Sequence, residues 1–586
     1  GGFGRSMAVT PWMAALGRND LLNKLASPIV DVQYACASAS ATPNRWADNL
    51  TSRPFTVEEI QEMVWHFGAT AKKLREAGID GVEIHAVHEG YNLDQFAIAN
   101  MNFRTDQYGG SLENRLRFAT EIVQSIHEQA GDDFPVSLRY SVRSCTKGWR
   151  KGAMPYEEFE EFGRDMAESE KAVKILQDAG YAFLNCDNGT YDAWYWAHPP
   201  QYMPDNCNLA DVEHIRQFID IPVACAGRMD PVKAAEEIAA GRLDAVAIAR
   251  QNLVDENWVT KIRTGHEEDI RPCIRCHNGC FNFSKANGTE NMQSLGDSLH
   301  LGRCALNPPT MQHNRYKIVP TKNPKKVAII GGGVGGMEAA RVSALRGYVV
   351  TLVEKNDHLG GHLVEAGAHS FKKEVRRLNE WYQRELADLG VKVLLGKEAD
   401  ESFVKDAGAD AVVIATGSST AIPPIPGIEH TIAALDAINH PEKLGDTIVI
   451  AGGGLVGCEI AYDEVMKGKK VTVVEALADI MAAGGAAPLP NMMMIKAEFA
   501  ARGVPVLTET RVTEIKPSGV VVADKDGNTC ELPADTIVNA LGFRPVHALA
   551  DALEAAGVKV CTIGDATGAA NILKAVADGY AVGNAI

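Results

Sequence analysis

The sequence predicts an α/β protein in which a partial TIM barrel precedes a cysteine-rich segment and two Rossmann-like nucleotide-binding domains. Three observations support this class. Short apolar strands alternate with helices over residues 55–265, three cysteines fall within residues 273–280, and two glycine-rich fingerprints follow residue 323. Short apolar strands separated by helices are typical of parallel sheets, because each crossover between parallel strands needs room for a helix.

The first part contains five such strands before the cysteines. An α/β barrel needs eight, so the five fit strands 4–8 of a barrel, and a small open sheet is the alternative. We therefore expect the chain to be a fragment that lacks about three strands, roughly 100 residues, at its front. Its opening, GGFGRSMAV, has neither an initiator Met nor a signal segment. The five strands are expected at residues 81–86, 135–141, 182–186, 222–227 and 245–250.

Composition narrows the class of protein. The chain has 586 residues and a net charge of −17, which argues against a nucleic acid or an anionic membrane as a partner. No apolar run approaches the roughly 20 residues that span a bilayer. Twelve cysteines in so long a chain do not make a disulfide scaffold. We expect a cytoplasmic enzyme that acts on a small molecule, with a homo-oligomeric state left open.

Four of the cysteines lie close together in the sequence. RPCIRCHNGC (271–280) has the spacing C-x2-C-x3-C, and Cys304 follows after a polar, glycine-containing loop. Zinc sites usually combine two C-x2-C pairs or Cys and His pairs, whereas thiolates on one short loop suit a [4Fe–4S] cluster. A cluster is therefore favoured, with zinc or free thiols as alternatives, and His277 is more simply a loop residue than a ligand. The expected ligands are Cys273, Cys276, Cys280 and Cys304.

The second half contains an internal near-repeat, residues 326–355 and 447–476. Each copy reads strand, G-x-G-x-x-G, helix, strand and acid. In such a Rossmann fingerprint the glycines permit the tight turn and let the backbone approach a pyrophosphate, while the acid accepts from a ribose hydroxyl. Two copies imply two dinucleotides. Their glycines are Gly331, Gly333 and Gly336, then Gly452, Gly454 and Gly457, and their acids are Glu354 and Glu475.

Three further segments resemble the FAD-binding parts of two-dinucleotide flavoproteins of the disulfide-reductase type. They are HLGGHL (358–363), VVIATGS (412–418) and TIGDATG (562–568). The resemblance implies FAD at the first fingerprint, a nicotinamide cofactor at the second, and Asp565 near the ribityl chain. It adds Gly361, Thr416, Gly417 and Gly564 to the cofactor-binding residues. It also implies an FAD domain over 323–425, an inserted NAD(H) domain over 426–530 and a second FAD part over 531–586.

Glu475 bears on the choice of nicotinamide. A carboxylate about 4 Å from a 2′-phosphate costs roughly 4 kcal/mol per unit charge at an effective dielectric constant of 20. No Arg replaces the acid in VVEALADIM (473–481). We expect NADH to be preferred over NADPH.

The order of barrel, cysteines and two nucleotide domains resembles the long Old Yellow Enzyme family, which includes 2,4-dienoyl-CoA reductase, trimethylamine dehydrogenase and bile-acid-inducible NADH:flavin ene-reductases. FRTDQYGGSLENR (103–115) is characteristic of that family, and YDAWYWAHPP (191–200) is similar to its bile-acid and flavonoid branch. The resemblance implies an FMN-binding barrel over 1–265 and a [4Fe–4S] segment over 266–322.

The same resemblance places FMN at the carboxyl-terminal mouth of the barrel. It implies that Arg139 lies near the flavin pyrimidine and that a phosphate site forms where the last two strands end. A guanidinium suits phosphate because it binds two oxygens at once. Without the front strands, FMN is expected to bind weakly and C=C reduction to fail. The residues at the two strand ends are Gly227, Arg228, Ala249 and Arg250.

Candidate catalytic residues follow the first predicted strand. Tyr91 matches the proton donor of the dienoyl-CoA reductase, and His85 and His88 match a pair that holds a carbonyl or anion in shorter relatives. Here the first histidine and the tyrosine are six residues apart, with Glu89 as the extra residue, so the role of His88 is open. Tyr191 stands where the dienoyl-CoA reductase has a second acid.

The resemblance implies an NADH-dependent ene-reductase in which electrons pass from NADH to FAD, the cluster, FMN and an activated C=C bond. Its substrate would be an enone or enoyl-CoA, of steroid or flavonoid type if Trp149, Trp194 and Trp196 line the pocket rather than the core. One alternative is an amine oxidoreductase like trimethylamine dehydrogenase. Another is a non-catalytic or partial electron-transfer scaffold.

Overall fold

The computed structural model describes residues 4–7, 9–47, 49–88, 90–281, 303–314, 316–483 and 487–586. The chain folds into two compact units. The first unit comprises Gly1–Pro199 and Met203–Ile248, and the second comprises Pro200–Tyr202 and Ala249–Ile586. Among the described helices, none combines the length and the apolar composition that crossing a membrane requires.

The first unit is built on a parallel sheet with the order β1-β2-β5-β6-β7, which follows the sequence order of the five predicted strands. Alternate strand residues such as Leu138 and Leu184 are fully buried in one core with Ile122 and Leu176 of the covering helices. The α/β class is therefore confirmed. The strands are β1 (Val82–Val87), β2 (Val136–Ser141), β5 (Phe183–Asp187), β6 (Val223–Ala226) and β7 (Ala245–Ala247), and the helices that accompany them are α4 (Val57–Glu76), α6 (Leu112–Ala130), α7 (Met166–Ala179), α9 (Leu209–Arg216) and α10 (Pro231–Ala239).

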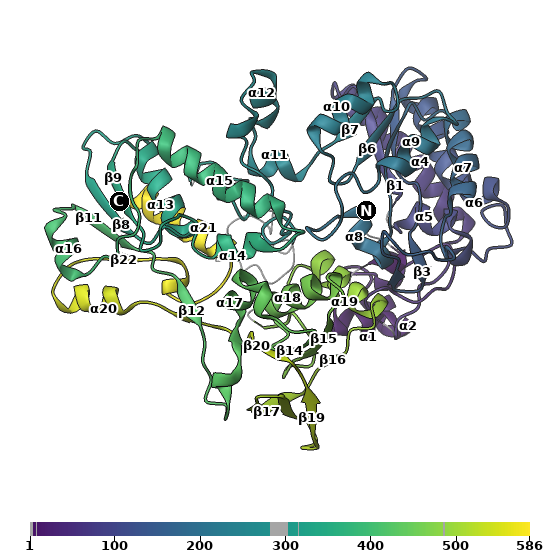
Figure 1. Cartoon of the computed structure of the whole chain (residues 1–586). Helices are drawn as coiled ribbons and strands as arrows, with labels where there is room; N and C mark the ends of the chain where they lie inside the picture. The colour runs from purple at the N-terminus through teal and green to yellow at the C-terminus, as the bar shows by residue number, and fades with distance from the viewer. Residues whose placement is uncertain are drawn as a thin grey trace. The chain divides into compact units, whose positions relative to one another are not determined.

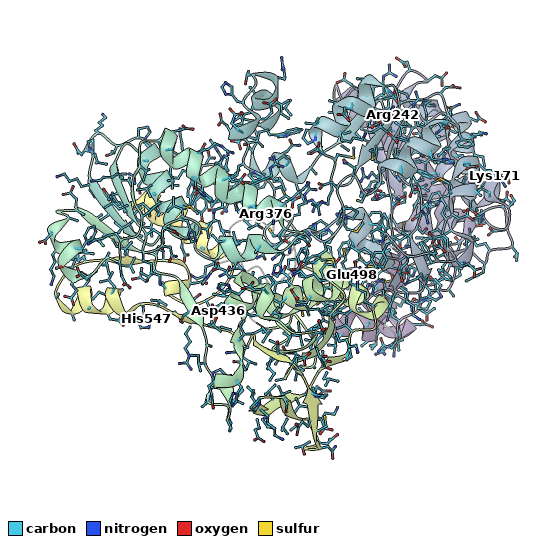
Figure 2. The ribbon with its side chains drawn as sticks, in the orientation of Figure 1. Lys171, Arg242, Arg376, Asp436, Glu498 and His547 are labelled. Carbon is cyan, nitrogen blue, oxygen red and sulfur yellow. The ribbon has the colours of Figure 1, made fainter. Side chains whose placement is uncertain are left out.

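Shorter elements surround this sheet. The long helix α4 begins with a capping box, in which Thr56 and Glu59 satisfy each other's backbone amides. Charged side chains such as Lys171 and Arg242 lie on exposed surface (Figure 2). The shorter elements are α1 (Pro11–Gly17), α2 (Asp20–Ala26), α3 (Val32–Ala35), α5 (Asn92–Ala97), β3 (Thr146–Gly148), β4 (Lys151–Gly152) and α8 (Trp194–Ala197).

Strand register places the polar side chains of the first sheet in one row. His85 of β1 pairs with Arg139 of β2, which pairs with Asn185 of β5. Because side chains alternate between the two faces of a strand, these three lie on the same face, opposite the buried leucines. The sheet therefore brings the candidate residues together near its carboxyl edge.

The second unit contains two more parallel sheets, ordered β10-β9-β8-β11-β22 and β13-β20-β14-β15-β16. Each fingerprint joins the central strand of one sheet to a helix, β8 to α13 in the first copy and β14 to α18 in the second (Figure 1). The first copy consists of β8 (Lys326–Ile330), α13 (Val334–Leu345) and β9 (Val349–Val353), with β10 (Lys392–Leu394), β11 (Ala411–Ile414) and β22 (Cys561–Thr562). The second consists of β14 (Thr447–Ala451), α18 (Leu455–Met466) and β15 (Lys470–Val474), with β13 (Ile432–Ala433), β16 (Val506–Leu507) and β20 (Thr536–Asn539).

An antiparallel ribbon of β12 (Ser418–Thr420) and β21 (Phe543–Pro545) joins the two nucleotide-binding parts. The chain thus leaves the first sheet, completes the second and returns, as expected for an inserted domain. The remaining elements are α11 (Arg250–Val254), α12 (Trp258–Arg263), α14 (Leu363–Ala368), α15 (Lys373–Asp388), α16 (Glu401–Asp406), α17 (Ala434–Asn439), α19 (Leu489–Ala501), the antiparallel sheet β17 (Arg511–Lys516), β18 (Gly519–Ala523) and β19 (Thr529–Pro533), and α20 (Ala548–Ala555) and α21 (Ile572–Ala585).

Candidate functional site

A chain of hydrogen bonds links two histidines to a carboxylate at the carboxyl edge of the first sheet. His88 Nε2 lies 2.7 Å from Asp187 Oδ1, and His88 Nδ1 lies 3.0 Å from His85 Nε2. His88 and Asp187 are buried, whereas His85 is exposed. Because an ionised carboxylate only accepts hydrogen bonds, His88 donates from Nε2 and accepts at Nδ1 from the Nε2–H of His85.

Arg139 supplies the positive charge that balances Asp187. Its guanidinium donates to the other oxygen of Asp187, to Asn185 Oδ1 at 2.5 Å and towards His88 Nε2 at 3.3 Å. The contact with His88 is long, and the shorter bond to Asp187 determines the His88 tautomer. A buried carboxylate is tolerated only when it is paired and hydrogen-bonded, and Arg139 provides both for Asp187.

The two candidate tyrosines are neighbours. The Tyr191 hydroxyl donates to the Tyr91 hydroxyl at 3.3 Å, and their rings meet edge to face with centroids 5.5 Å apart. The Tyr91 ring also lies 4.8 Å from the imidazole of His85. The structure thus brings His85, His88, Tyr91 and Tyr191 into one cluster, although the sequence separates the tyrosines by 100 residues. Glu89 lies outside the described residues.

Only one of the three tryptophans named from the sequence joins this cluster. Trp194 lies 4.9 Å from the Tyr191 ring, and Trp46, which the sequence did not single out, lies 6.1 Å from Trp194. Trp196 is buried and donates to the Ala153 carbonyl at 2.8 Å. Trp149 packs on Phe162 and on the guanidinium of Arg5.

The loop that carries Tyr191 is fixed by the next residue. The buried carboxylate of Asp192 lies 3.1 Å from Arg5 NH1 and 2.9 Å from Arg45 Nε. Arg45 Nε also donates to the Tyr191 carbonyl at 3.2 Å. The ion pairs of Asp192 with Arg5 and Arg45 could not be predicted from the sequence, because no local pattern relates residues so far apart.

The expected phosphate residues lie at the ends of β6 and β7. Gly227 has φ +113°, and a Cβ there would lie 2.3 Å from Asn208 Nδ2, so only glycine fits. Arg228 is buried, donates to the Met203 carbonyl and pairs with Asp205 at 3.0 Å. Ala249 and Arg250 belong to the second unit, where Arg250 begins α11.

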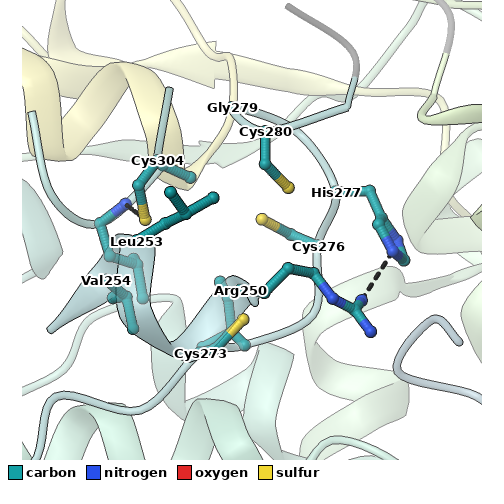
Figure 3. Close-up of a pocket in the computed structure, with 12 residues that line it drawn as sticks. Arg250, Leu253, Val254, Cys273, Cys276, His277, Gly279, Cys280 and Cys304 are labelled. Atoms are coloured by element: carbon teal, nitrogen blue, oxygen red, sulfur yellow. Dashed lines mark hydrogen bonds between the residues drawn. The ribbon is translucent and has the colours of Figure 1, made fainter. Parts of the chain in front are cut away.

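The four predicted cysteine ligands line one pocket of the second unit, together with Arg250 (Figure 3). No three of their sulfur atoms lie within 4.8 Å of one another, although the structure describes all four. A single tetrahedral zinc ion would bring its thiolates within about 3.8 Å, given Zn–S bonds of about 2.3 Å. The wider spacing suits a larger centre. The thiols are those of Cys273, Cys276, Cys280 and Cys304.

Burial raises the pKa of three of these thiols. It raises that of Cys280 to about 11, against an opposing effect of the Arg250 charge, that of Cys304 to about 12, and that of Cys276 well above its usual range. Thiolates at such positions need positive charge, which the ions of a metal centre supply. The donor set and its burial fit an iron–sulfur cluster.

The loop between the cysteines is held in an unusual backbone conformation. Arg275 and His277 both have φ +56°, which is rare for residues other than glycine. His277 Nε2 lies 2.6 Å from Arg250 NH1, and its Nδ1 lies 2.8 Å from Asn491 Oδ1. Arg275 Nε lies 3.2 Å from the buried carboxylate of Glu374. Both nitrogens of His277 are thus engaged, as expected of a loop residue rather than a ligand.

The two fingerprints have the same geometry. A Cβ on Gly336 would lie 1.9 Å from the Gly331 carbonyl oxygen, and one on Gly457 would lie 2.0 Å from that of Gly452. Such close backbone packing keeps the loop small enough for a pyrophosphate at the helix N-terminus. Gly333 and Gly454 are the N-cap residues of α13 and α18.

The two acids also match. Glu354 Oε2 accepts from the Gly332 amide at 2.7 Å, and Glu475 Oε2 accepts from the Gly453 amide at 2.8 Å. The second oxygen of Glu475 accepts from the Leu477 amide at 2.8 Å. Both carboxylates are therefore fixed at the ends of β9 and β15, next to their glycine loops.

The predicted FAD segments converge on the first fingerprint. Gly333 and Gly360 form a β-bridge, and a Cβ on Gly361 would lie 2.9 Å from the Gly333 Cα. Ser418 donates to Asp565 Oδ2 at 3.0 Å. Thr416 donates to the Val546 carbonyl, and Gly417 and Gly564 have φ +73° and +62°. This cradle of bare backbone next to an acid fits a bound dinucleotide.

Two protein families account for most of the chain. Residues 13–269 match the NADH:flavin oxidoreductase / NADH oxidase family, and residues 325–584 match the pyridine nucleotide-disulphide oxidoreductases. These matches support binding of FMN by the first part and of FAD and NAD(H) by the second.

Similar proteins match most of the length of the chain. A cinnamate reductase from Clostridium sporogenes is 42% identical over 94% of this chain and 81% of its own length. An NADH oxidase from Thermoanaerobacter brockii is 35% identical over 90% of this chain and 78% of its own. The structure of a 2-naphthoyl-CoA reductase in complex with 2-naphthoyl-CoA superposes with a TM-score of 0.83 at 28% identity, over 94% of this chain and 80% of that chain.

Proposed function

Because the chain belongs to the NADH:flavin oxidoreductase / NADH oxidase family, as a 2,4-dienoyl-CoA reductase-like member of the Old Yellow Enzymes, we propose that it reduces the activated C=C bond of an aromatic 2-enoate, enone or enoyl thioester. The observation that carries this proposal is the cluster of His85, Tyr91 and Tyr191 with the buried His88–Asp187 pair. Its likeness to cinnamate reductase supports the substrate class.

The cofactors would supply the electron chemistry. Electrons would pass from NADH to FAD, then singly through a [4Fe–4S] cluster to FMN, and as a hydride to the β-carbon of the substrate. The residues proposed to hold them are the cysteines of the second unit, the two glycine loops, and Arg139, Gly227 and Arg228 of the first unit with Ala249 and Arg250.

The protein supplies the proton for the α-carbon. We assign it to the hydroxyl of Tyr91, because this ring lies between His85 and Tyr191. A phenol is a weak acid near neutral pH and gains from a neighbouring group that stabilises the phenolate. The Tyr191 hydroxyl donates to Tyr91 and serves that purpose.

His85 has a separate role in this proposal. The hydrogen-bond chain to Asp187 holds the His85 ring in one orientation, from which a protonated His85 would donate to a substrate carbonyl or carboxylate. Such a donor withdraws charge from the alkene and prepares the β-carbon for hydride. His88 orients His85 and does not itself contact the substrate.

Trp194 and Trp46 suit an aromatic substrate. Both lie against Tyr191, and Trp194 is the nearer, at 4.9 Å between ring centroids. Aromatic side chains bind flat rings by offset or edge contacts. This arrangement favours an aryl group on the alkene.

The test is a substrate panel under anaerobic conditions, with the whole protein and its cofactors reconstituted. NADH consumption and the reduced product are measured for aromatic enoates, enones, enoyl-CoA esters and N-methylamines. We expect an aromatic enoate or enoyl ester to be reduced with one product per NADH. Oxidation of an amine without NADH would instead place the protein with the amine dehydrogenases of its family.

A further inference from the structure

A short segment of the second unit binds a buried carboxylate of α18. Pro200–Tyr202 belong to the second unit, although the residues before and after them belong to the first. Gln201 and Tyr202 are buried there, at 8% and 5% exposure. We call Pro200–Tyr202 the docking arm.

The docking arm binds one buried carboxylate. Glu459 Oε1 accepts from Gln201 Nε2 at 2.7 Å and from the Tyr202 hydroxyl at 2.9 Å. Its other oxygen accepts from Lys372 Nζ at 2.5 Å. Glu459 is 3% exposed, so these three donors replace the water that a carboxylate otherwise needs. Burial and the Glu459 charge hold the pKa of Tyr202 well above its usual range, so its hydroxyl remains a donor.

Aromatic rings also pack against the docking arm. The Tyr202 ring meets Phe371 at 5.3 Å and Tyr462 at 5.9 Å between centroids, in both cases edge to face. Tyr462 and Glu459 both belong to α18, and Phe371 belongs to the segment before α15. The arm therefore touches both nucleotide-binding parts at once.

The segment before α15 and helix α18 also contact each other directly, next to the docking arm. Ser370 donates to Asp463 Oδ1 at 3.2 Å, and His369 Nδ1 lies 3.5 Å from Asp463 Oδ2. Residues 369–372 thus lie along α18. At Glu459 the docking arm and Lys372 bind the same carboxylate. The two parts also meet where Asn439 of α17 donates to Glu365 Oε1 of α14 at 3.3 Å, and at the ribbon of β12 and β21.

The position of α18 matters because of what lies at its start. Its N-cap residue is Gly454, within the second fingerprint, and Glu459 is two residues beyond Gly457. A nicotinamide bound there must reach FAD at hydride-transfer distance, and a misplacement of about 1 Å can cost up to about 100-fold in rate.

We propose that Gln201 and Tyr202 are positioning residues for hydride transfer from NADH, because their docking on Glu459 fixes α18 against residues 369–372. This inference rests on the proposed roles of the two nucleotide sites. The docking arm is expected to affect the rate of hydride transfer and not the affinity for NADH, because neither Gln201 nor Tyr202 belongs to the glycine loop.

The test compares Tyr202→Phe, which keeps the ring and removes the hydroxyl, with Tyr181→Phe. Tyr181 is a matched control, because its buried hydroxyl donates to the Ala119 carbonyl at 2.8 Å in the first unit. FAD reduction by a series of NADH concentrations is followed anaerobically by stopped flow. FAD content and photochemical reduction of the FAD report folding independently of NADH.

We expect Tyr202→Phe to lower the limiting rate of FAD reduction by about 5- to 50-fold, with the Kd for NADH within about two-fold of the unmodified value. Tyr181→Phe should react at the unmodified rate. A limiting rate within about two-fold of the unmodified one overturns the inference. If Tyr202→Phe loses its FAD, the same measurement on Gln201→Met decides, because that variant keeps the tyrosine. If NADH fails to reduce the unmodified protein, the proposed function falls and this inference falls with it.

Discussion

The imidazole of His88 lies 2.7 Å from the buried carboxylate of Asp187, and this contact determines the tautomers of two histidines. Because the carboxylate accepts the Nε2–H of His88, the Nδ1 of His88 must accept from His85. The Nε2–H of His85 is thereby committed to His88. The pair thus divides into a buried residue, His88, which orients its partner, and an exposed residue, His85.

Replacing Asp187 tests this division. In Asp187→Asn the amide no longer requires a donor from His88, so the tautomers of both histidines are released. We expect the rate of C=C reduction to fall by about 10- to 100-fold, while NADH reduces FAD at the unmodified rate. Asp178→Asn, on the exposed side of α7, is the control and should change neither rate. An unchanged turnover in Asp187→Asn would remove the histidine relay from the mechanism.

The two tyrosines differ in their expected contributions. Tyr91→Phe removes the proposed proton donor, and we expect the reduction of the alkene to slow by about 100-fold or more. Tyr191→Phe removes the hydrogen bond to Tyr91 and should lower the rate about ten-fold. Reoxidation of the NADH-reduced protein by substrate separates the two variants. The reverse order of effects would assign the proton to Tyr191.

The strands and both fingerprints could be predicted from the sequence because they depend on local patterns. Apolar runs such as VEIHAV, and glycines spaced as at Gly331, Gly333 and Gly336, have the same meaning in any context. The convergence of Tyr91 with Tyr191 followed from resemblance, and strand order then explains it. Asp187 was missed, because an acid at the end of a strand has no distinctive pattern until register places it beside Arg139.

Contacts between segments that are far apart in the sequence could not be predicted either. Arg250 was assigned to a phosphate site from its place after a strand, and that assignment stays a prediction. The structure places it against Cys280 and His277, in the same unit as the cysteines. Trp46 and Asp192 were missed for the same reason as Glu459, since each acquires its neighbours only through the fold.

Removing one cysteine tests the cluster. The protein should contain about four irons and four labile sulfides, and Cys276→Ala should lose them while FAD stays bound, because the FAD cradle is formed by other segments. Cys530→Ala, on an exposed strand of the second unit, should keep its iron. Stoichiometric zinc and a colourless site would contradict the assignment.

Nucleotide preference tests the role of Glu475. Both of its oxygens accept backbone amides, so the charge is fixed beside the second glycine loop. We expect NADH to reduce FAD at least about ten-fold faster than NADPH at equal low concentration, as a repulsion of roughly 1.4 kcal/mol or more implies. Glu475→Ala combined with Leu477→Arg should narrow the ratio. Equal rates in the unmodified protein would show that Glu475 does not select the nucleotide.

The most direct test of the central claim is a single turnover without oxygen. The reconstituted protein is first reduced with one equivalent of NADH per electron pair it accepts, and is then mixed with an aromatic 2-enoate while flavin absorbance and product are recorded. The account predicts reoxidation of the flavin with the saturated acid formed in the same amount as NADH consumed. A flavin that stays reduced in the presence of enoates, enones and enoyl thioesters alike, yet is reoxidised by oxygen, would contradict it.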